Sequence, residues 1–136
     1  MRIGVVIAVL AIVVGCGAGA SSSATGSTDL RIALWPEGQG KGDVQRWTLR
    51  CAPAGGTVPR AATACAKLNE MQSPFAPLRK DLQCTQIYGG PQEAVVSGTF
   101  RGNRIWVKLT ARDGCQIARA KKLAFLVPGM SAGAAS

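Results

Sequence analysis

The stretch WTLRCAPAGGTVPRAATACAKL, residues 47–68, joins an alternating apolar pattern to a helical one and carries a cysteine in each. Residues 47–51 alternate between apolar and polar side chains, which predicts a β-strand. A loop rich in glycine and proline follows over 53–59. From residue 61 to 71 the period changes, and one face of the predicted helix carries Ala61, Cys65 and Leu68. The stretch therefore predicts a strand, a loop and a helix, in that order.

The same alternation predicts further strands on both sides of this stretch. Residues 30–35 form one, which ends at a turn with a proline and three glycines over 36–42. Residues 94–101 and 104–111 both alternate, and Gly102-Asn103 between them is a hairpin signal. This hairpin is the clearest structural prediction in the chain.

Two weaker predictions complete the fold. The apolar run 123–127, stopped by Pro128, suits a final strand, and residues 75–81 suit a short second helical turn. The sum is an α+β fold: an antiparallel sheet of about five strands with one or two short helices packed on one face.

The composition excludes most enzyme chemistry. The chain has 136 residues, with 16 Lys+Arg, 7 Asp+Glu, a net charge of +9, five cysteines and no histidine. Without histidine there is no Ser-His-Asp or Cys-His pair and no histidine-ligated zinc. The carboxylates are scattered singly, and the cysteine spacings make no metal-binding pattern. We therefore expect no enzymatic activity, no metal and no cofactor.

The N-terminus has the pattern of an export signal. A basic residue precedes the apolar run 3–14, which is too short to span a bilayer comfortably and suits the core of a secretory signal. Val13-Val14-Gly15-Cys16 resembles the bacterial lipobox, which implies that Cys16 receives a lipid and becomes the new N-terminus. A plain cleaved signal is the alternative. The lipobox reading predicts an exported protein that is lipid-anchored on the extracytoplasmic side of the cell membrane.

The cysteine count agrees with that interpretation. If Cys16 carries lipid, four cysteines remain for two disulfides, and sequence alone allows three pairings among Cys51, Cys65, Cys84 and Cys115. The predicted organisation is a signal peptide at 1–15, the lipidated cysteine and a small, polar tether at 16–28, one folded domain at 29–128, and a disordered tail at 129–136.

Four stretches resemble the subtilisin inhibitor-like family of small secreted bacterial serine protease inhibitors. They are WTLRCAPAGGTVPRAATACAKL (47–68), CTQIY (84–88), VVSGTFRGNRI (95–105) and DGCQ (113–116). The resemblance covers nearly all of 29–128, and the first stretch is its most specific part. It implies disulfides Cys51–Cys65 and Cys84–Cys115, a subtilisin-like serine protease as partner, and inhibition by a loop that binds the protease as a substrate does.

Carried over by position, the resemblance makes Gln86–Ile87 the reactive bond. The protease-binding loop is then Cys84, Thr85, Gln86, Ile87 and Tyr88. The neutral Gln86 side chain would enter the primary specificity pocket, so we expect subtilisin-like enzymes to be inhibited better than trypsin. After Tyr88 the chain departs from the family pattern, because Gly89-Gly90 precedes Pro91, and glycines add flexibility where the mechanism needs stiffness.

Two other interpretations of the domain remain open. One is an envelope lipoprotein that keeps the inhibitor fold without inhibiting and binds a polyanion or a protein through a basic sheet face. That face would gather Arg46, Arg50, Arg104 and Lys108 around Trp106. Trp106 and Val95 could equally mark a homodimer contact through the sheet, as family members often pair. No nucleic-acid motif accompanies the charge, so we expect no nucleic-acid partner.

Overall fold

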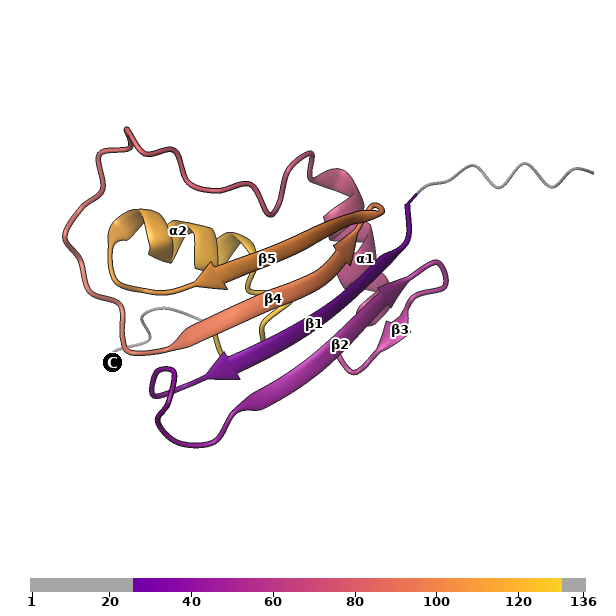
Figure 1. The fold of residues 1–136 in the computed structure, drawn as a ribbon, viewed down its shortest axis with the longest axis horizontal. Helices are drawn as coiled ribbons and strands as arrows, with labels where there is room; N and C mark the ends of the chain where they lie inside the picture. The colour runs from indigo at the N-terminus through magenta and orange to yellow at the C-terminus, as the bar shows by residue number, and fades with distance from the viewer. Residues whose placement is uncertain (1–25, 131–136) are drawn as a thin grey trace, which may run out of the picture.

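A computed structural model describes residues 26–130 and shows one antiparallel sheet with two helices. The strands are β1 (Thr28–Trp35), β2 (Gln45–Cys51), β3 (Gly55–Gly56), β4 (Glu93–Phe100) and β5 (Asn103–Leu109), in the order β3-β2-β1-β4-β5 (Figure 1). The helices are α1 (Ala61–Glu70) and α2 (Gly114–Lys122). The predicted α+β fold is therefore confirmed. The predicted signal peptide, Cys16, most of the predicted tether and residues 131–136 of the predicted tail lie outside the described residues.

One face of the sheet is buried because apolar side chains alternate along each long strand. In β1, Leu30, Ile32 and Leu34 are buried while the residues between them face outward. The helices supply Ala64, Leu68 and Ala120 to the same core, so both helices cover this face. Neither helix in the described part of the chain is long and apolar enough to cross a membrane.

The predicted final strand at 123–127 is wrong. These residues continue α2 as a series of turns, with hydrogen bonds from Leu126 N to Leu123 O (2.9 Å) and from Met130 N to Val127 O (3.0 Å). All four residues are fully buried at the spacing of one helical face. A short apolar run does not distinguish a strand from such turns, and the fifth strand is β3 instead.

Three smaller expectations also differ from the structure. No helix forms over 75–81, where only isolated turns appear, because Pro74 and Pro77 remove two backbone donors. Helix α2 was not expected, although Asp113 caps it by accepting a hydrogen bond from Gln116 N (2.9 Å). Met130 belongs to the core rather than to the tail, so the folded part extends past residue 128.

The topology brings one long connection past the start of α2. Residues 71–92 run from the end of α1, around the outside of α2, and back to β4 (Figure 1). Strand β5 ends at Leu109, and residues 110–113 lead from it into α2. The connection and this short segment lie side by side, and that contact positions the candidate site.

Candidate functional site

The loop expected to bind a protease lies exposed in the long connection. Thr85, Gln86, Ile87 and Tyr88 are all exposed, with Ile87 at 59% and Tyr88 at 66%. These two are among the few large apolar side chains left in solvent, whereas Cys84 is half-buried. Among residues 26–130, no backbone hydrogen bond holds 86–88. Their amides and carbonyls are therefore available to pair with another chain.

Both disulfides implied by the family resemblance are present. Cys51–Cys65 joins β2 to α1 with Cα atoms 5.7 Å apart. Cys84–Cys115 joins the loop to the first turn of α2 with Cα atoms 5.3 Å apart. The second bridge fixes the loop two residues before Gln86.

A backbone hydrogen bond strengthens the same side of the loop. Gly114 N donates to Thr85 O at 2.9 Å, directly beside the disulfide. A side chain on Gly114 would place its Cβ 2.0 Å from Thr85 Oγ1, so a larger residue at position 114 would force the Thr85 side chain to move. The residue before Gln86 is thus held by its own backbone against the start of α2.

The other side of the loop is tied to the same segment. Gly89 N donates to Ala111 O at 2.7 Å, and Gln92 Nε2 donates to Gly89 O at 3.2 Å. A Cβ on Gly89 would lie 2.9 Å from Ile117 Cδ1, and Gly90 has φ +125°. Gly90 therefore has a backbone conformation that other residues enter only with strain, whereas a side chain at position 89 would require Ile117 and Ala111 to shift. Gly89 and Gly90 therefore have defined contacts in the fold, and the expected flexibility of this glycine pair stays a prediction.

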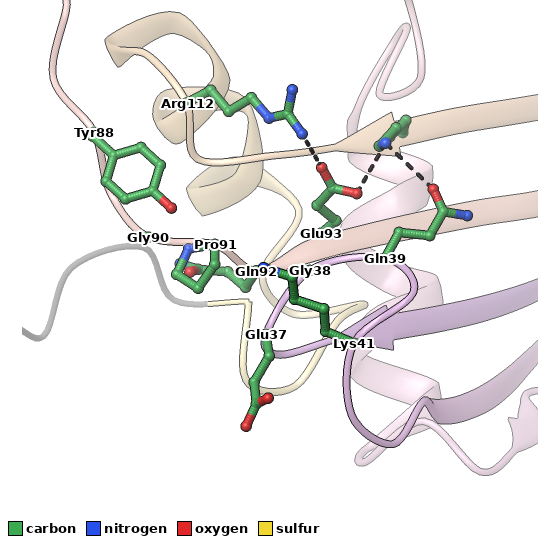
Figure 2. A pocket seen from close by; sticks show the side chains of 11 residues that line it. Glu37, Gly38, Gln39, Lys41, Tyr88, Gly90, Pro91, Gln92, Glu93 and Arg112 are labelled. Atoms are coloured by element: carbon green, nitrogen blue, oxygen red, sulfur yellow. Dashed lines mark hydrogen bonds and ion pairs between the residues drawn. The ribbon is translucent and has the colours of Figure 1, made fainter.

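Beyond these glycines, the chain enters β4 through a buried ion-pair cluster at Glu93 (Figure 2). The Glu93 side chain is only 7% exposed and is the one buried charged side chain within residues 26–130. Lys108 Nζ lies 2.9 Å from Glu93 Oε2, and Arg112 donates to Glu93 Oε1. Tyr88 and Gly90 line the hollow in which this cluster lies. Sequence reasoning missed the cluster, since its members are distant in the chain.

The hydrogen bond from Lys108, together with Arg112, lowers the pKa of Glu93 from its ordinary value of 4.5, although burial opposes the shift. The unfolded chain then binds the proton more readily than the folded one. We expect the contribution of Glu93 to the free energy of unfolding to be fully present above its ordinary pKa of 4.5 and to be lost as the pH falls through the lower folded-state pKa. Urea unfolding at about pH 7 and about pH 3 measures the difference.

A matched pair of variants assigns that pH dependence to Glu93. Glu93→Gln should flatten the acid side of the profile. Asp81→Asn should change it less, because Asp81 pairs with Arg79 at 73% exposure, and exposed pairs contribute little. A Glu93→Gln profile that is parallel to the wild-type profile would contradict this assignment.

Cys84, Cys115 and Asp113 also form a group whose ligand atoms lie within 4.8 Å of one another. The two sulfurs are joined in the disulfide, so they have no thiolate to offer a metal. Asp113 Oδ1 already accepts the capping hydrogen bond of α2. The group is a structural junction.

The outer face of the sheet gathers the basic residues as expected. Strand register places Arg50 and Arg104 in one row across the sheet, and Arg46 and Lys108 in another. Trp106 lies between the rows on β5 and is 67% exposed. Arg31 in β1 adds a charge at the centre of this face.

Comparisons with known protein families, sequences and solved structures each find a match. The model of the subtilisin inhibitor-like family matches residues 25–112. A probable subtilase-type protease inhibitor of Streptomyces avermitilis is 39% identical over 71 residues, which cover 50% of this chain and 49% of that protein. Subtilisin inhibitor-like protein 5 of Streptomyces fradiae is 36% identical over 73 residues, which cover 52% of this chain and 67% of that protein. The chain thus spans about half of the first relative and two thirds of the second.

Among solved structures, the fold is similar to Streptomyces caespitosus sermetstatin, crystallised in complex with Bacillus licheniformis subtilisin. The TM-score is 0.46 at 25% sequence identity, over 72% of this chain and 97% of that one.

Proposed function

The chain belongs to the subtilisin inhibitor-like family, and on this premise we propose that it inhibits subtilisin-like serine proteases with Gln86–Ile87 as its reactive bond. The observation that carries the proposal is the double attachment of the loop. Thr85 on one side of the bond and Gly89 on the other are both hydrogen-bonded to the segment 111–114, and Cys84 is covalently joined to Cys115.

This attachment would keep both sides of the reactive bond close together after the protease has cut it. The protease serine would attack the Gln86 carbonyl carbon, and Ile87 N would depart as an amine while the acyl group stays on the enzyme. Because the Ile87 side stays tied to the same body, the amine remains near the acyl carbon and can attack it, which re-forms the bond and frees the serine. A loop that is ordered before docking also loses little entropy on binding.

Titration of subtilisin with the full chain, both disulfides formed, tests the proposal. Stoichiometric loss of activity with the chain mostly intact is expected, and trypsin should be inhibited weakly. A chain that leaves both enzymes active would contradict the proposal, whether its loop is digested or untouched. It would favour a domain that has kept the fold without inhibiting.

Anchoring through lipid on Cys16 is part of the same proposal and rests on the lipobox pattern of residues 13–16. An anchored inhibitor would protect the cell surface from proteases outside the membrane. In the producing cell, Cys16→Ser should move the protein from the membrane fraction to the medium. An unchanged membrane fraction would argue against the lipid.

The basic sheet face supports a second candidate function, which is binding of a polyanion. In the described part of the chain, no ion pair involves Arg31, Arg46, Arg50 or Arg104, and Asp29 is the one carboxylate within their rows. Two basic sheet faces would repel each other in a homodimer, whereas a polyanion would neutralise their charge. The exposed Trp106 ring adds a surface on which a ligand could stack.

We expect Arg31→Gln/Arg104→Gln to elute from heparin-agarose at clearly lower salt than the wild-type chain. Lys121→Gln/Lys122→Gln removes the same charge from α2 and is the matched control. Equal elution of the two variants would remove the polyanion role. A dimer mass in sedimentation that Trp106→Ser abolishes would assign the face to a second copy of the chain instead.

A further inference from the structure

The two sides of the reactive bond are held by different kinds of contact. On the acyl side, the Cys84–Cys115 disulfide adds a covalent link. The leaving-side segment, residues 87–92, contains no cysteine. It is held by the Gly89–Ala111 and Gln92–Gly89 hydrogen bonds and, where it enters β4, by the ion pairs of Glu93.

Glu93 joins three parts of the fold at the end of that segment. Its carboxylate contacts Lys108 on β5 and Arg112 on the strand-to-helix segment, and Figure 2 shows the pair with Arg112. Lys108 Nζ also donates to Gln39 Oε1 (3.4 Å) in the turn between β1 and β2. Arg112 directly follows Ala111, whose carbonyl accepts from Gly89 N. The ion pair and the loop anchor are therefore neighbours on one short segment.

Burial makes the Glu93 cluster sensitive to the loss of one of its members. An exposed ion pair contributes little, but a carboxylate that is 7% exposed loses its water and depends on its partners. Replacing the carboxylate by an amide removes the charge and one of the two acceptor oxygens, so Lys108 and Arg112 can no longer both pair with this side chain. The sheet ladder still holds the start of β4 between β1 and β5, but the side chain of Arg112 no longer ties the segment 111–112 to it, so Ala111 O is held less firmly opposite Gly89 N.

We propose that Glu93 is a positioning residue for resynthesis of the reactive bond, which rests on the inhibitory function proposed above. When the Gln86–Ile87 bond breaks, the Ile87 amine either attacks the acyl carbon, displacing the serine oxygen, which takes a proton, or drifts away. In the second case water attacks the acyl carbon and leaves a Gln86 carboxylate and an Ile87 ammonium. The Glu93 cluster favours the first outcome, because it keeps the leaving-side segment in place.

The test compares cleaved and intact inhibitor at equilibrium with catalytic subtilisin. For Glu93→Gln, we expect the ratio of cleaved to intact chain to rise on the order of tenfold, the size of one charged hydrogen bond. Resynthesis starting from the cleaved chain should slow by a similar factor, while association of the intact chain with subtilisin changes little. A general loss of stability would not give this pattern. Asp81→Asn, which removes an exposed pair on the acyl side, should match wild type.

A second variant and hydrogen exchange at Gly89 N test the positioning role independently of Glu93→Gln. If Glu93→Gln does not fold, Arg112→Gln is the second variant, because the Arg112 side chain is 68% exposed and its loss is tolerable. Either variant should raise hydrogen exchange at Gly89 N, which is measurable even if the wild-type chain proves not to inhibit. A folded variant with wild-type cleavage, resynthesis and Gly89 exchange would overturn the positioning role. A wild-type chain without inhibition would overturn the proposed function instead.

Discussion

Gln86→Lys is expected to convert the chain into a trypsin inhibitor, with affinity for trypsin at least about a hundredfold above that of the wild-type chain. A trypsin-like specificity pocket has a buried aspartate, which a lysine would neutralise and a glutamine leaves unpaired. The fold can accept the change, because Gln86 is exposed and its side chain makes only a long contact with Cys84 O (3.5 Å). Inhibition constants for trypsin and subtilisin measure the effect.

Gln83→Lys is the matched control. It introduces the same charge three residues earlier on an exposed position of the same loop. If Gln86 is the residue that enters the pocket, Gln83→Lys gains little against trypsin. Equal gains from the two variants would show a general charge effect, and no gain from Gln86→Lys would remove Gln86 from the specificity pocket.

Loss of the Cys84–Cys115 bridge is expected to turn the inhibitor into a substrate. Cys84 lies before the reactive bond and Cys115 after it, so the bridge covalently joins the two pieces of a cleaved chain. Without it, the acyl side is held mainly by the Thr85–Gly114 hydrogen bond. We expect Cys84→Ser/Cys115→Ser to be digested by subtilisin and to lose at least about a hundredfold in apparent affinity, alongside about 3–4 kcal/mol of stability.

The other disulfide separates the two effects. Cys51→Ser/Cys65→Ser should lose about 3 kcal/mol, a similar amount, yet its loop keeps every anchor. At a temperature where both variants are folded by circular dichroism, only the variant without the loop bridge should fail to inhibit. If both variants fail alike, stability rather than attachment of the loop determines inhibition. If both inhibit, the bridge has no part in the mechanism.

The regular part of the fold is readable from the sequence because burial on one face imposes a simple period. The alternation in 30–35, 47–51, 94–101 and 104–111 identified the four long strands, and the change of period at residue 61 identified α1. The strand predicted at 123–127 was wrong because a few consecutive apolar residues are as compatible with buried turns as with a strand. Strand β3 has only two residues and pairs through glycine backbone, which leaves no side-chain pattern.

The site was predictable only in part. The resemblance to the family supplied the loop and the cysteine pairs, and the pairs are confirmed. The anchors at Ala111 and Gly114 are backbone groups, so residue type gives no sign of them. Glu93 looked like one carboxylate at the start of a strand, and only the fold brings Lys108 and Arg112 to it. The Asp113–Gln116 capping pattern was the one available signal for the helix that holds the loop.

The mass and fragment pattern of the full chain after incubation with catalytic subtilisin shows whether Gln86–Ile87 is a reactive bond that the protease cuts and re-forms. The proposed mechanism predicts a single cut, at Gln86–Ile87, that adds one water while the disulfide keeps the two pieces together. It also predicts that intact and cleaved chains converge on the same mixture from either starting form. Cleavage at another bond, or digestion that proceeds until no intact chain remains, would contradict it.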